Sequence, residues 1–106
     1  MTLDKILIGA TAFLEQEIAA PAPSSWQKFA YYAMIPMAVK ILQQKAEEYK
    51  PLAESLGMVS AEGEWNLAML KEATEEAIRK SGPFTAAGVI IKADDLTKLW
   101  DVYLKE

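Results

Sequence analysis

The chain has 106 residues, a length typical of one domain (1–106) that buries a core without disulfides or metal, and its net charge is −4. It contains neither cysteine nor histidine, which excludes disulfides, thiolate ligands, and the usual metal ligand and general base near neutral pH. Arg79 is its single arginine and the lysines are scattered, so no basic cluster is available for nucleic acid or an anionic membrane surface.

The first predicted element is a helix over residues 2–19 with Thr2 as its N-cap. Apolar side chains recur at intervals of three and four and form one stripe, which contains Leu3, Ile6, Leu7, Ala10, Phe13, Leu14 and Ile18. The segment is superficially similar to a signal peptide, but cleavage after Ala20 or Ala22 would leave a proline at the new N-terminus. We therefore expect an amphipathic first helix and a cytoplasmic protein.

The second predicted helix begins after Ser24 or Ser25, because the preceding prolines end the first helix. One side repeats at alternating intervals of three and four, which is typical of helices that pack side by side. This seam consists of Tyr32, Ile35, Val39, Leu42, Ala46, Tyr49, Ala53 and Leu56. Pro36 predicts a bend, and Pro51 marks either a second bend or a short separate helix that ends at Gly57.

The same helix carries a second apolar face over residues 26–41. Its members are Trp26, Phe29, Ala30, Ala33, Met34, Met37 and Ile41. Other helices of the chain can cover this face, a second copy or a different protein can bind it, or a ligand pocket can open at the Pro36 bend. A membrane span is not expected, because only eleven residues separate Lys28 from Lys40 and a span needs about twenty apolar residues. The outer side turns polar beyond residue 42, which limits a partner surface to the N-terminal half of the helix.

After this helix, a turn is predicted around Gly63, between short strand positions at Val59 and Trp65. Asn66 is the expected N-cap of a third long helix over residues 67–80.

The C-terminal segment predicts a small antiparallel hairpin at about 84–92, in which 84–86 pair with 89–92. Asp94 is expected to cap a last helix over 95–105. The predicted fold is mainly α with a minor β element, in the order α-α-(short α)-β-α-β-β-α.

No catalytic, metal or cofactor site is predicted, so the chain is not expected to be an enzyme. The serines have no histidine to pair with, and the five glycines are too dispersed for a phosphate-binding loop. The stretch SAEGEWN has the acid-Gly-acid centre of a calcium loop, but that alignment places Met58 at the first ligand position. A helix start explains the adjacent Asp94 and Asp95 better than a catalytic carboxylate pair does.

Two stretches of the sequence carry a resemblance to known proteins. An acid-Gly turn is followed by an acidic helix in SLGMVSAEGEWNLAMLKEA. An apolar strand is followed by an Asp-capped helix in GVIIKADDLTKLWDVYL. Together they resemble small uncharacterised proteins encoded in phages and prophages of Firmicutes-type bacteria. The resemblance covers the C-terminal half of the chain. It implies a virion-assembly, tail-associated or accessory role through protein contacts, and it assigns a function to no residue.

The predicted function is therefore non-enzymatic protein–protein interaction or assembly, as a homo-oligomer, with the second apolar face as the contact. A small protein that binds an apolar ligand or lipid, with its pocket near Pro36, is one alternative. The other is a small enzyme that uses a buried lysine, such as Lys40, beside a carboxylate.

Overall fold

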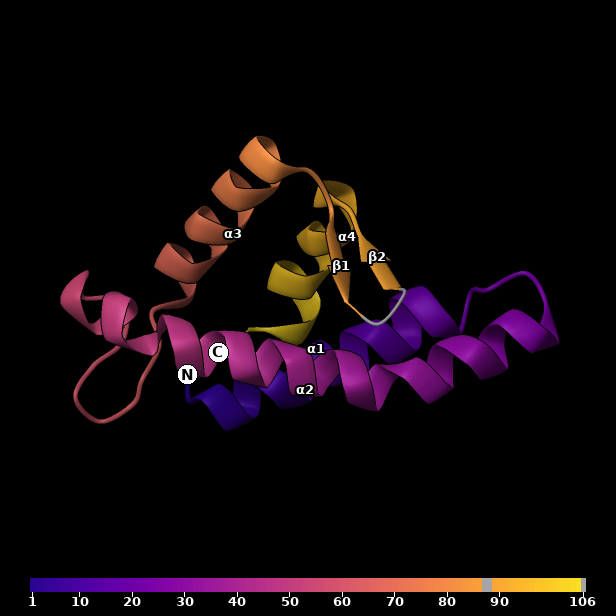
Figure 1. Ribbon diagram of the computed structural model, residues 1–106, viewed down its shortest axis with the longest axis horizontal. Helices are drawn as coiled ribbons and strands as arrows, with labels where there is room; N and C mark the ends of the chain where they lie inside the picture. Colours follow the sequence, from indigo (N-terminus) through magenta and orange to yellow (C-terminus); the bar gives the residue numbers. More distant parts are fainter. Residues whose placement is uncertain (87–88, 106) are drawn as a thin grey trace.

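A computed structural model describes residues 1–86 and 89–105, and it shows a mainly helical fold with a small β element (Figure 1). The elements in this part of the chain are α1 (Leu3–Phe13), the π-helix η1 (Leu14–Ala19), α2 (Ser25–Ser55), α3 (Leu67–Ser81), β1 (Phe84–Ala86), β2 (Val89–Ile91), α4 (Ala93–Lys98) and the π-helix η2 (Leu99–Tyr103). The predicted fold class is confirmed.

Helix α2 determines the length of the molecule. Its 31 residues, at 1.5 Å per residue, give about 46 Å, and the longest dimension of the molecule is 44 Å. Ser24 caps it, because its hydroxyl accepts a hydrogen bond from the Gln27 N–H at 3.1 Å. The helix continues through both Pro36 and Pro51, so the segment after Pro51 is not a separate helix. It ends before Gly57, whose φ of 74° is readily adopted by glycine.

The helix predicted over 2–19 is present as α1 followed directly by η1, and the Thr2 hydroxyl accepts from the Lys5 N–H at 3.4 Å. Both segments pack against α2, and η2 packs against α1. Gly9 permits the close contact between α1 and η2. A Cβ atom at Gly9 would lie 2.6 Å from Leu104 Cδ2 and 2.7 Å from the Tyr103 carbonyl oxygen.

The core lies where these elements meet. Phe13 and Leu14 are its largest fully buried side chains, and the Phe13 ring meets the Tyr103 ring edge-on at a centroid distance of 5.8 Å. Trp65 and Trp100 are buried in the same cluster. Ile35, Ala38 and Ala53 are the core residues of α2, and the list of buried apolar residues is completed by Ile6, Ala10, Ala19, Ala22, Met58, Val59, Ile78, Ile91, Leu96 and Leu104.

The last position of the predicted α2 seam is wrong, because Leu56 is 54% exposed. The chain folds back at this point, and the Met58 N–H donates to the Ala53 carbonyl at 2.8 Å. Met58 and Val59 then enter the core, where the sequence pattern places Leu56.

The segment between α2 and α3 forms the predicted short bridge, in which Val59 pairs antiparallel with Trp65. A second isolated bridge joins Thr2 to Glu64. The Asn66 side chain accepts from the Met69 N–H at 3.1 Å, which confirms it as the cap of α3. In Figure 1, α3 rises at an angle from the C-terminal end of α2 and does not run along the N-terminal half of α2.

The hairpin β1–β2 pairs Phe84 with Ile91 and Thr85 with Ile90, as predicted. Among the described residues it is a two-stranded sheet of its own and does not pair with 58–66. The connection between the two strands, residues 87–88, lies outside the described residues.

The predicted start of the last helix is wrong, since α4 begins at Ala93 and not after Asp94. The carboxylate of Asp95 accepts from the Lys92 N–H at 3.0 Å and holds the first turn from inside the helix. The helical chain ends at Tyr103.

Candidate interaction surface

Helix α2 buries one side in the core and exposes the other. Successive residues of an α-helix are about 100° apart, so Trp26, Phe29, Ala33 and Met37 fall within an arc of about 80°. This arc faces away from Ile35, which is 4% exposed. On the outer side, Trp26 is 74%, Phe29 is 66% and Met37 is 61% exposed. The helix therefore carries an apolar surface that the described part of the chain does not cover.

The structure places all seven residues of the predicted contact on this side or at its edges. Ala33 is exposed, Met34 is 39% exposed, and Ala30 and Ile41 are half-buried at the margins. The name outer face is used below for Trp26, Phe29, Ala30, Ala33, Met34, Met37 and Ile41.

The aromatic end of the outer face is ordered by its own contacts. The rings of Trp26 and Phe29 stack with a centroid distance of 6.0 Å and an interplanar angle of 27°. Both residues lie in the first turns of α2, at the end of the molecule where the chain enters the helix after residues 20–24 (Figure 1). The two rings contact each other and are exposed to solvent. Aromatic side chains have few rotatable bonds, so they lose little entropy when they bind.

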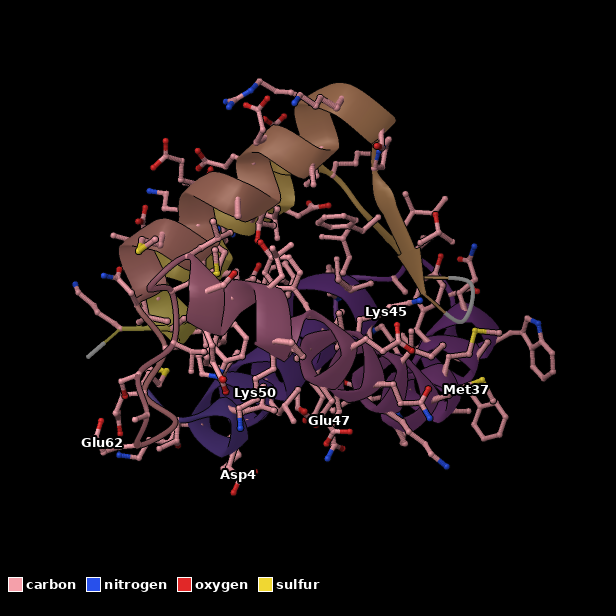
Figure 2. The ribbon with its side chains drawn as sticks, turned by 60° about the vertical axis from the view of Figure 1, so that its left-hand side comes forward. Asp4, Met37, Lys45, Glu47, Lys50 and Glu62 are labelled. Carbon is pink, nitrogen blue, oxygen red and sulfur yellow. The ribbon has the colours of Figure 1, made fainter. Side chains whose placement is uncertain are left out.

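The outer face has a sharp polar boundary. Met37 lies on the outside of α2, whereas Lys45, Glu47 and Lys50 lie further along the helix (Figure 2). On the same side, Met37 is followed by the exposed Lys40 and then by the exposed Gln44. An apolar stretch that ends abruptly on one helix side indicates a bounded surface rather than a generally apolar helix.

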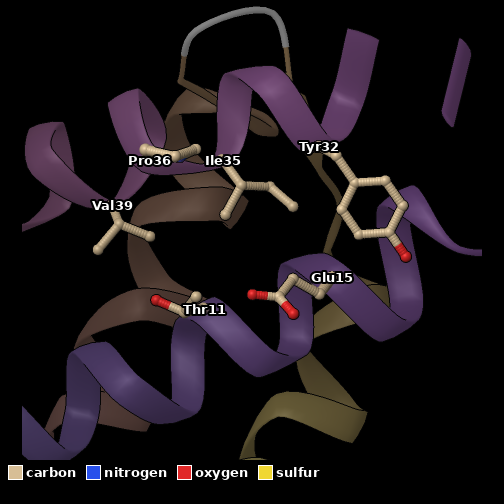
Figure 3. A pocket seen from close by; sticks show the side chains of 6 residues that line it. All are labelled: Thr11, Glu15, Tyr32, Ile35, Pro36 and Val39. Carbon is tan, nitrogen blue, oxygen red and sulfur yellow. The ribbon is translucent and has the colours of Figure 1, made fainter. Parts of the chain in front are cut away.

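A groove lies beside the outer face, between α1 and α2, at the position of the predicted pocket. Its volume is about 270 Å³, and it is lined by Thr11, Glu15, Tyr32, Ile35, Pro36 and Val39 (Figure 3). Tyr32, which the sequence pattern places in the buried seam, is 43% exposed here. Small-molecule pockets are usually 300–1,000 Å³. The groove is thus small, and it has an acidic side chain in its lining.

One group of polar contacts joins elements that are far apart in the sequence. Glu17 of η1 accepts from Lys98 at 3.1 Å and from the Tyr103 hydroxyl at 3.0 Å. The hydrogen bond from Lys98, with that from Tyr103, lowers the pKa of Glu17. Desolvation, with the nearby Glu17 carboxylate, raises the pKa of Tyr103. These groups fasten η1 to α4 and η2.

The candidate residue for an enzyme is not in the position that such a reaction requires. Lys40 is exposed on α2, so it is not the buried lysine that this alternative requires. In residues 1–86 and 89–105, no group of three acidic side chains is placed to hold a metal ion. Within the same ranges, none of the helices has the length and apolar character needed to cross a membrane.

No protein-family model, curated protein or solved structure matches the chain. The resemblance to phage and prophage proteins stays a prediction.

Some exposed apolar side chains lie outside the predicted contact. Leu52 and Leu56 form an exposed pair four residues apart at the end of α2, and the seam pattern gave the wrong environment for Leu56. Ile8 is also exposed. The sequence predicts this exposure, because Ile8 lies off the apolar stripe of the first helix.

Proposed function

We propose that the protein is a non-enzymatic assembly component that contacts a second copy of itself through the outer face of α2. The observation that carries this proposal is the stacked Trp26–Phe29 pair, left exposed next to Met37 on a rigid helix. Tryptophan, other aromatic residues and methionine are enriched in protein interfaces, and tryptophan is frequent among the residues that dominate binding energy.

The size of the exposed area supports a contact role. Large aromatic side chains present 150–250 Å² each, so the exposed fractions of Trp26 and Phe29 correspond to roughly 300 Å². The largest apolar patch on an ordinary monomer is about 300–600 Å² and often has a function. With Met37 and the margins added, the outer face lies within this range.

The biological setting that we propose follows from the sequence. The resemblance to phage and prophage proteins supports a virion-assembly, tail-associated or accessory role in the bacterial cytoplasm. An assembly protein of this kind needs a contact surface and no reactive groups.

The test is the absolute mass in solution, measured by light scattering on a sizing column over a range of concentrations. The monomer mass is 11.7 kDa. We expect the wild type to exceed this mass as its concentration rises, and Met37→Lys to stay monomeric with unchanged helix content by circular dichroism. Gln44→Lys is the matched control, because it adds the same charge on the same side of α2 beyond the apolar stretch, and it should behave as the wild type.

Two results would overturn the proposal. One is a wild type that is monomeric over the whole series. The other is loss of helix content in Met37→Lys but not in Gln44→Lys, which would place Met37 in the core of the monomer.

A further inference from the structure

Five exposed residues on the outer side of α2 are spaced symmetrically. Trp26, Phe29, Ala33, Met37 and Lys40 follow one another at intervals of three, four, four and three. All five fall within the same arc of about 80° on the helix. The sequence of intervals is the same in both directions, and the smallest side chain, Ala33, lies at its centre.

We infer that two copies pair their α2 helices antiparallel, across a two-fold axis that passes through Ala33. This inference rests on the proposed function and adds the geometry of the contact. In a two-fold interface, if residue i contacts residue j, then residue j contacts residue i. With Ala33 on the axis, Phe29 of each copy lies opposite Met37 of the other, and Trp26 lies opposite Lys40.

Each opposed pair has favourable chemistry. Methionine sulfur and an aromatic ring attract each other, as do a lysine ammonium and the face of an indole. Ala33 opposite Ala33 allows the two helix axes to approach to the short end of the 8–10 Å range.

The charges favour this direction over the parallel one. Lys28 and Lys40 are the charged residues between residues 26 and 42. Of these two, only Lys40 lies within the arc, because Lys28 is about 20° from Ile35 around the helix. A parallel pair in register would place Lys40 beside its own copy, and like charges repel. The antiparallel pair places Lys40 opposite Trp26 instead.

The ends of the helix give an independent check. An axis at Ala33 places Ser25, the first residue of α2, opposite residue 41 of the other copy. Ile41 is the last apolar residue of the outer face, and the exposed Gln43 and Gln44 follow it. The outer face thus becomes polar where the partner helix would end.

The area of the proposed contact is small. An outer face of about 500 Å² on each copy buries roughly 1,000 Å² in total, which is the range of small, reversible interfaces. We therefore expect a reversible dimer whose population rises with concentration.

Disulfide trapping tests the geometry, since the natural chain has no cysteine and any introduced cysteine is the only thiol. Each variant is oxidised under identical mild conditions, and the dimer is measured on a non-reducing gel. Ala33→Cys should give at least tenfold more disulfide dimer than the control Gln44→Cys. Position 29 lies four residues from the axis, so two copies of Phe29→Cys are about 12 Å apart along the helices, beyond disulfide reach.

A mixture of variants identifies the direction. Equal amounts of Phe29→Cys and Met37→Cys should form mixed dimers, while each variant alone should stay near the control. Dimers of each variant alone, as abundant as the mixed ones, would overturn the antiparallel geometry. Circular dichroism of every variant checks that it is folded.

The two proposals fail differently. If light scattering gives a dimer but Ala33→Cys and the mixture both stay at control level, the two-fold axis is refuted and the proposed function stands. If the wild type is monomeric at all concentrations, both are refuted.

Discussion

The substitution Gly9→Ala separates what the local sequence predicts from what the structure predicts. Gly9 lies inside α1, and an alanine in a helix interior is about 0.8–1.0 kcal/mol more favourable than a glycine. By helix propensity alone, this variant should be more stable than the wild type. The added Cβ atom, however, would lie within 2.7 Å of both Leu104 Cδ2 and the Tyr103 carbonyl oxygen.

The magnitude follows from what can move. The Leu104 side chain is itself buried, and the Tyr103 oxygen belongs to the backbone, so α1 and η2 must separate slightly. Overfilled core positions typically cost 1–3 kcal/mol, and a clash with backbone favours the upper half of that range. After the propensity gain is subtracted, Gly9→Ala should lower the free energy of unfolding by about 1–2 kcal/mol.

Urea unfolding followed by circular dichroism measures this difference, with a lower midpoint and an unchanged slope as the expected result. Gln44→Gly and Gln44→Ala provide the control, because Gln44 is exposed in α2 and the pair reports the glycine-to-alanine difference without a steric term. The free energy of unfolding of Gly9→Ala could instead exceed that of the wild type by the difference between Gln44→Ala and Gln44→Gly. That result would show that the close contact between α1 and η2 does not exist.

Two further substitutions test individual polar contacts by the same unfolding assay. Glu17→Gln should destabilise the protein at pH 7, because hydrogen bonds from Lys98 and Tyr103 lower the pKa of Glu17 in the folded state. A lowered pKa contributes stability above the unfolded value, about 4.3, and that contribution is lost as the pH falls through the folded value. The difference from the wild type should therefore shrink below pH 4, and a difference that is constant down to pH 2 would contradict the assignment. Asn66→Ala should cost about 1 kcal/mol, because the Met69 N–H loses its cap at the start of α3, and an unchanged midpoint would show that this cap does not contribute.

The parts of the fold that the sequence predicts depend on short-range bonds. Thr2, Ser24 and Asn66 each accept a hydrogen bond from a backbone N–H three residues ahead, so the residue type and its position suffice. At the last helix, either of two adjacent acidic residues can satisfy a backbone N–H of the first turn. The sequence pattern does not show whether Asp94 is the N-cap or whether Asp95, inside the helix, accepts from the Lys92 N–H. The π-helical segments were not predicted, since a change from four-residue to five-residue backbone bonds leaves the apolar spacing nearly unaltered.

The candidate surface was likewise predictable from the sequence only in part. The apolar character of residues 26–41 is readable from the sequence, but exposure depends on where the other helices lie. Only the arrangement in space shows that α3 departs from the far end of α2 (Figure 1). The exposure of Trp26 and Met37 also follows from the folded structure. The exposure of Tyr32 and the groove beside Pro36 likewise depend on the packing of α1 against α2.

Helix α2 runs unbroken from Ser25 to Ser55, so its buried side and its exposed side belong to one continuous helix. The buried side stabilises the fold, whereas the exposed side is free to change. Exposed positions usually tolerate substitution within about 0.5 kcal/mol, whereas core positions such as Ile35 do not. Mutation can therefore redesign the outer face, for a new partner or a new affinity, while selection for a stable fold acts on other residues. The helix separates the two requirements by rotation about its axis, within one continuous stretch of sequence.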